Sequence, residues 1–85
     1  MSKSMLHILS AVVRTLPATQ DSVARRIAAC DGADVVAVDR GRIIVVLEAD
    51  DQCNLADMLN RIAGMDGVLS ATMVFEHSEP DGAAA

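Results

Sequence analysis

The residue types that most often carry chemistry are few in this sequence and widely spaced. Cys30 and Cys53 do not form a C-x-x-C pair, and two thiols are too few for a disulfide scaffold. We expect both to be reduced and packed as small apolar residues. His7 and His77 should meet at one end of a sheet if the first and last strands pair, but the cysteines offer them no obvious help in holding a metal. The sequence therefore predicts no metal site.

The hydroxyl and carboxyl groups form no catalytic pattern. Ser10 and Ser70 lack the flanking glycines of a nucleophile elbow. The Asp50-Asp51 pair stands at the start of a predicted helix, where helix capping explains it. The segment 64–67 is too short for a phosphate-binding loop, and no G-x-x-x-x-G-K-[ST] motif occurs. We therefore predict that the chain is not an enzyme and carries no cofactor.

Length and composition restrict the possible partners. The chain has 85 residues, of which 52% are hydrophobic and 22% charged, as expected of one small globular domain. Phe75 is the only aromatic residue, so the core must be aliphatic. Seven basic against twelve acidic residues give a net charge of -5. This charge, with no aromatic stacking platform, argues against nucleic acid and favours a cationic partner.

No segment of the sequence predicts insertion into a membrane or secretion. No apolar run approaches the roughly 20 residues that a membrane-spanning helix needs. The apolar run within residues 1–13 is short, is broken by His7 and Ser10, and lacks a cleavage pattern of small residues. We therefore expect a cytoplasmic protein.

The hydrophobic pattern alternates between strand and helix periods. Apolar and β-branched runs predict strands, and apolar residues at i, i+3, i+4 and i+7 predict helices that glycines can end. Within a domain over 1–77, we expect strands at 5–14, 34–39, 42–48 and 67–76, helices at 19–30 and 50–64, and a disordered tail at 78–85. This β-α-β-β-α-β order predicts an α+β, ferredoxin-like fold: a four-stranded antiparallel sheet of order 4-1-3-2 with both helices on one face.

Alternation along each strand divides the sheet into a core face and an open face. We assign the wholly apolar sets to the core, which include Leu69, Ala71, Met73 and Phe75 of the last strand. The other sets contain hydroxyl groups or Glu48 and should form the open face: Ile8, Ser10, Val12, Ile44, Val46, Glu48, Val68, Ser70, Thr72 and Val74. Val36 and Val38 would extend its apolar patch.

The predicted open face carries more aliphatic residues than a solvent-facing sheet needs. We expect a second copy of the domain or an apolar peptide to cover it. The small side chains of Ser10, Ser70 and Thr72 would let a helix approach closely. Glu48, with Asp39, Asp50 and Asp51 nearby, would meet a positive charge on the partner.

Three segments of the sequence resemble one known family. HILSAVV (7–13), GADVVAVDRGRIIVVLEADD (32–51) and MDGVLSATMVFEH (65–77) are similar, in order and spacing, to the NapD family. The resemblance implies a small cytoplasmic chaperone with a ferredoxin-like fold. It also implies a partner: the twin-arginine signal peptide of the periplasmic nitrate reductase catalytic subunit precursor. Binding would restrain export until the molybdopterin-guanine-dinucleotide cofactor and the iron–sulfur cluster are installed in that subunit.

Two other functions share the predicted topology. An ACT-like regulatory module that senses a small molecule would carry a glycine-rich turn between the first strand and the first helix, where Leu16-Pro17-Ala18 stands instead. A metallochaperone would carry C-x-x-C in the same loop, and this loop has none. The Arg25-Arg26 pair lies in the middle of the first predicted helix, so we expect both side chains to lie on its solvent-exposed face.

Overall fold

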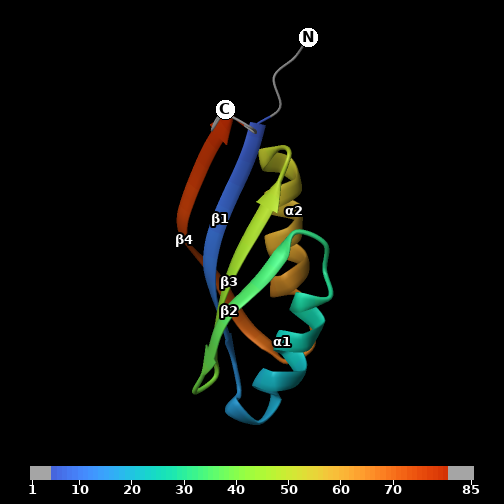
Figure 1. The fold of residues 1–85 in the computed structure, drawn as a ribbon. Coiled ribbons are helices and arrows are strands. Elements are labelled where there is room, and N and C mark those ends of the chain that lie inside the picture. The colour runs from blue at the N-terminus through green and yellow to red at the C-terminus, as the bar shows by residue number, and fades with distance from the viewer. Residues whose placement is uncertain (1–4, 81–85) are drawn as a thin grey trace.

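The structure is a computed structural model that describes residues 5–80. A four-stranded antiparallel sheet packs both helices against one of its faces (Figure 1). The elements are β1 (Met5–Thr15), a short 3-10 turn (Pro17–Thr19), α1 (Gln20–Ala28), β2 (Ala33–Asp39), β3 (Arg42–Ala49), α2 (Gln52–Ala63) and β4 (Val68–Pro80). The strand order β2-β3-β1-β4 confirms the predicted ferredoxin-like arrangement, in which β1 and β3 are central.

The two helices begin differently. The Thr19 side chain does not cap α1, because its hydroxyl donates instead to the carbonyl oxygen of Leu16 at 3.2 Å. α2 has a side-chain cap, since Oδ1 of Asp51 accepts a hydrogen bond from the backbone N–H of Asn54 at 2.8 Å. This bond satisfies one of the N–H groups that have no partner within the helix. α2 therefore begins close to its predicted start, and Gly64 ends it as expected.

A two-residue turn joins β2 to β3. Arg40 and Gly41 both have positive φ angles, 53° and 78°, as a tight hairpin turn of type I′ requires. The backbone of Gly41 also makes two hydrogen bonds: its N–H donates to Oε1 of Gln20 at 2.6 Å, and its carbonyl accepts from the N–H of Thr15 at 2.7 Å. The hairpin tip is thereby attached to the end of β1 and the start of α1.

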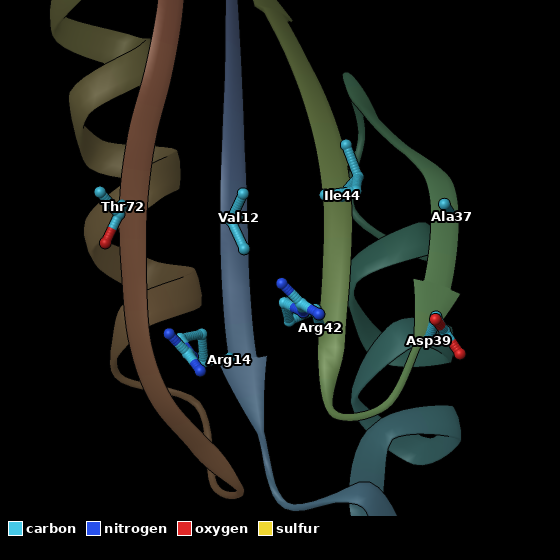
Figure 2. A pocket seen from close by; sticks show the side chains of 7 residues that line it. All are labelled: Val12, Arg14, Ala37, Asp39, Arg42, Ile44 and Thr72. Atoms are coloured by element: carbon cyan, nitrogen blue, oxygen red, sulfur yellow. The ribbon is translucent and has the colours of Figure 1, made fainter.

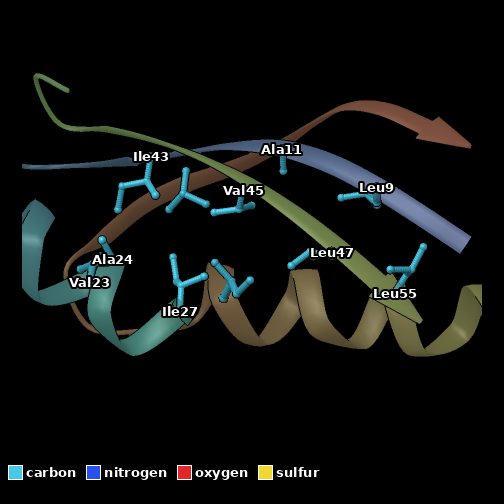
Figure 3. Close-up of a cluster of buried hydrophobic side chains, with 11 residues drawn as sticks. Leu9, Ala11, Val23, Ala24, Ile27, Ile43, Val45, Leu47 and Leu55 are labelled. Atoms are coloured by element: carbon cyan, nitrogen blue, oxygen red, sulfur yellow. The ribbon is translucent and has the colours of Figure 1, made fainter. Parts of the chain in front are cut away.

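The core is aliphatic and lies between the sheet and the helices (Figure 3). β1 and β3 contribute side chains to it in strict alternation, as predicted, and both helices contribute one apolar stripe. The buried residues are Leu9, Ala11, Val13, Ile43, Val45 and Leu47 from the strands, and Val23, Ala24, Ile27, Leu55 and Ile62 from the helices. Phe75 is not among them.

The assignment of faces in β4 is wrong for several residues, because two irregularities interrupt its pairing with β1. The register shifts between Ser10 and Ala11 and again between Arg14 and Thr15, so that Val74 and Leu69 have no partner on β1. Each extra residue reverses the alternation beyond it. Phe75 consequently lies opposite Ser10 on the open face and is 57% exposed.

The same register places the other β4 residues. Leu69 is the extra residue of the second irregularity and is 66% exposed, so the core prediction is wrong for it. Met73 lies opposite the buried Ala11, on the predicted face, but it is 50% exposed and not part of the buried core, whereas Ala71 packs against the core as expected. Val68 pairs with Thr15, which is only 5% exposed, and packs against the core instead of joining the open face.

A third irregularity lies in β2. The register with β3 shifts between Val35 and Ala37, which leaves Val36 without a partner and 63% exposed. Val38 then lies opposite the buried Ile43 and packs against the core. The predicted extension of the open face by Val38 is therefore wrong.

The last strand is longer than predicted. Ser78 pairs with His7, and the two residues after Ser78 continue the ladder to the start of β1. Nδ1 of His7 and Oγ of Ser78 are 2.6 Å apart. A disordered tail from Ser78 is therefore wrong for residues 78–80, because β1 supplies a backbone partner for each of them. The rest of the predicted tail, 81–85, lies outside the described residues.

Candidate functional site: the open face of the sheet

The open face of the sheet is organised around the pairing of β1 with β3. Partners in an antiparallel pair point to the same face, so each pair of this ladder sets two neighbouring side chains on the open face. From one end to the other, the pairs on this face are Ile8–Glu48, Ser10–Val46, Val12–Ile44 and Arg14–Arg42. The middle of the face is therefore aliphatic with one hydroxyl, one end carries a carboxylate, and the other end carries two guanidinium groups.

Most of the residues predicted for this face do lie on it. The register places Thr72 opposite Val12 and Ser70 opposite Arg14, so both join the β1 and β3 residues there. Val74 is the extra residue of a bulge and is 65% exposed. Val68 points to the core. The structure thus brings together Ile8, Ser10, Val12, Ile44, Val46, Glu48, Ser70 and Thr72.

The sequence analysis did not place Arg14 and Arg42 on this face, and it also missed two rings of β4. Phe75 and His77 lie opposite Ser10 and Ile8, and their rings stack at 6.2 Å between centroids and 17° between planes. Nε2 of His77 is also 3.3 Å from Oε2 of Glu79. The alternation of β4 contains no signal for this arrangement, because the bulge at Val74 turns both rings to the open face. The β4 side of the face therefore has an aromatic border.

A hollow of about 450 Å³ lies at the end of the face that carries the arginines (Figure 2). Its lining consists of Val12, Arg14, Ala37, Asp39, Arg42, Ile44 and Thr72. Asp39 is opposite Arg42 in the β2–β3 register, but its carboxylate forms an ion pair with Arg40 at 3.9 Å. Within residues 5–80, neither Arg14 nor Arg42 has an ion pair within 4.0 Å. This end of the face is basic.

The opposite end is acidic. A second hollow, of about 410 Å³, is lined by Glu48, by Asp31 and Asp50 of the adjoining loops, and by Asp57 and Arg61 of α2, so it lies between this end of the sheet and α2. The predicted neighbours of Glu48 are thus partly wrong: Asp39 lies at the basic end of the face, and Asp51 is engaged in capping α2. Asp31 takes the place of Asp39, because the N–H of Glu48 donates to the carbonyl of Gly32 and brings that loop close.

The described part of the chain shows little else that could carry chemistry. No group of three or more His, Cys, Asp and Glu residues there is placed to hold a metal ion, and no helix there is long and apolar enough to cross a membrane. Sγ of the half-buried Cys30 donates to the carbonyl of Arg26 at 3.5 Å. Cys53 is exposed, so the expectation that it is packed as an apolar residue is wrong.

Comparisons with known proteins agree on one family. Residues 6–80 match the family model described as NapD protein. The chaperone NapD of Paracoccus pantotrophus is 37% identical over 75 residues, which are 88% of this chain and 67% of that protein. The solution structure of the E. coli Tat proofreading chaperone protein NapD superposes with a TM-score of 0.79 at 26% identity, covering 87% of this chain and 80% of that one.

Proposed function

This chain belongs to the NapD family and is a NapD-type chaperone, and we propose that its client is the twin-arginine signal peptide of the periplasmic nitrate reductase catalytic subunit precursor. The chaperone binds this peptide in the cytoplasm and restrains export until cofactor insertion is complete. It acts by occupancy, because a signal peptide that is bound to the chaperone cannot engage the translocase at the same time.

One observation carries the proposal: the open face joins an aliphatic middle to an acidic end. A twin-arginine signal peptide has a basic start followed by an apolar stretch. The aliphatic side chains of Val12, Ile44 and Val46 can bury the apolar stretch, which supplies most of the driving force. The Glu48 carboxylate, with Asp31 and Asp50 beside it, can pair with the peptide's guanidinium groups, which adds specificity.

The face is also accessible. α1 and α2 cover only the opposite side of the sheet, so no element in residues 5–80 lies over these side chains (Figure 1). Ser10 and Thr72 are small enough for a peptide to approach the sheet closely between the aliphatic residues. The family match and this accessible face favour a peptide client over the small-molecule ligand of an ACT-like module.

Calorimetric titration of the synthetic signal peptide tests the proposal. A Ser10→Arg, Thr72→Arg double variant places two long cations in the middle of the face, where they should block the peptide and repel its arginines. We expect the affinity to fall at least about tenfold, a loss of roughly 1.4 kcal/mol. The matched control is Ser22→Arg with Ala56→Arg, which adds the same charge to exposed positions of α1 and α2 and should bind as the wild type does.

Three results would contradict the proposal. The wild type could fail to bind the peptide, the two double variants could bind equally well, or the control could be the weaker binder. A second copy of the chain is the rival occupant of the face. Sedimentation of the protein, alone and with excess peptide, distinguishes a bound peptide from a second copy. A tight dimer that persists in excess peptide would show that the face is closed to the client.

A further inference from the structure

The open face carries opposite charges at its two ends along β1. Ile8 and its partner Glu48 lie at one end and the Arg14–Arg42 pair lies at the other. Ile8 and Arg14 are six positions apart on β1, which is about 20 Å at a strand's rise of about 3.3 Å per residue. An α-helix of about 13 residues has the same length. One short helical peptide segment is therefore long enough to contact both the carboxylate at one end of the face and the guanidinium groups at the other.

Among residues 5–80, the two arginines at the basic end have no acidic side chain within 4.0 Å. Like charges directly opposite one another destabilise a sheet, yet Arg14 and Arg42 are register partners on the two central strands. The acidic residue that shares their hollow, Asp39, is paired with Arg40 at the hairpin tip. Both guanidinium groups border the open hollow of about 450 Å³ (Figure 2). A negative group entering this hollow would offset the repulsion between them.

A peptide on this face cannot join the sheet as a further strand, because the backbones of β1 and β3 are already paired on both sides. A helix, by contrast, satisfies its own backbone and packs through its side chains. Its carboxyl end leaves carbonyl groups without partners and carries a partial negative charge. The arginine pair is suited to that end of the peptide and would repel the end that carries the peptide's own arginines.

We propose that the bound signal peptide runs parallel to β1, with its arginine end over Glu48 and the carboxyl end of its apolar segment over Arg14 and Arg42. The two arginines form an anion subsite that binds the carbonyls or carboxylate at that end of the segment. The inference rests on the proposed function and adds to it a direction and a second charged contact. Reversed binding would oppose four cations at one end of the face and leave Glu48 without a partner.

Paramagnetic broadening in NMR spectra measures the direction of the peptide. Two synthetic signal peptides carry a maleimide-linked nitroxide, one at the amino end and one at the end of the apolar segment, and each is added to ¹⁵N-labelled protein. We expect the first label to broaden the amide signals of Ile8 and Glu48, and the second to broaden those of Arg14 and Arg42. The opposite pattern, or equal broadening of both ends by each label, would overturn the inference while leaving peptide binding established. A failure of both peptides to bind would instead remove the proposed function, and the inference with it.

Single charge-removing variants test the subsite itself. Arg14→Gln and Arg42→Gln should each weaken peptide binding by about threefold to tenfold at low ionic strength, and the difference should shrink as salt rises. Arg25→Gln is the control, because Arg25 is exposed on α1, away from the open face. The variants should unfold at or above the wild-type temperature, since a like-charge pair is relieved. Unchanged affinity of both variants at low salt, or an equal loss in the control, would eliminate the subsite.

Discussion

Alanine variants of two adjacent isoleucines of β3 can distinguish side chains that stabilise the fold from side chains that bind the peptide. Ile43 is 0% exposed and lies in the core opposite Val13. Ile44 is half-buried on the open face opposite Val12. Replacing each by alanine is the same chemical change in the same strand, made once on each face of the sheet.

The expected magnitudes differ because the two side chains meet different surroundings. Ile43→Ala leaves a cavity in a packed core and should lower the free energy of unfolding by about 2 to 5 kcal/mol. Ile44→Ala should lower it by less than about 1.5 kcal/mol, since this side chain is already partly in water. Replacing a fully buried isoleucine by alanine removes three carbons, each of which contributes roughly 0.8 kcal/mol of burial free energy. Because Ile44 is already half-buried in the free protein, only about half of that free energy is gained when the peptide covers it. The affinity should therefore fall by about 1 kcal/mol, or roughly fivefold.

Urea unfolding followed by far-ultraviolet circular dichroism gives the stabilities, because a chain without Trp or Tyr offers no useful fluorescence. Titration calorimetry with the signal peptide gives the affinities. If Ile43→Ala does not fold, Ile43→Val serves in its place, at an expected cost of about 0.5 to 1.5 kcal/mol and with wild-type affinity. Equal destabilisation by the two alanine variants would refute the assignment of faces. Wild-type affinity of Ile44→Ala would refute the contact between this residue and the peptide.

Three further substitutions test local features of the fold by thermal unfolding. Asp51→Ala removes the acceptor for the N–H of Asn54 and should cost about 1 kcal/mol, with a cost near zero arguing against the cap. Gly41→Ala forces a side chain into a left-handed turn and against the backbone oxygen of Thr15, so it should cost more than about 1 to 2 kcal/mol; a neutral result would contradict the hairpin geometry. Phe75→Ala should cost less than about 1.5 kcal/mol, because the ring is 57% exposed, whereas a loss of about 3 kcal/mol or more would return Phe75 to the core.

The fold follows largely from patterns within single segments. The helices are visible in the sequence because one stripe of each, such as Leu55 and Ile62 of α2, must meet the sheet. The alternating side chains of β1 and β3 are predicted on the correct faces because these are the central strands. Each has alternating side chains on a regular β1–β3 ladder, so counting by two along the sequence gives the right face.

The edge strands were harder to predict for a physical reason. A bulge is a property of two paired strands, and the sequence of one strand does not show where its partner will skip a residue. The extra residues at Val36, Leu69 and Val74 therefore turned Val38 and Val68 inward and Phe75 outward.

Composition and periodicity together predicted an aliphatic, acidic domain with one sheet face left uncovered, because these properties depend only on which residues are present and how they repeat. The direction of charge along that face depends on which residues become neighbours. Arg14 and Arg42 are far apart in the sequence, and only the antiparallel register of β1 with β3 sets them side by side. The β2–β3 register carries Asp39 to the arginine end, and the β1–β3 register leaves Glu48 at the other, so the tertiary structure alone gives the open face its two unlike ends.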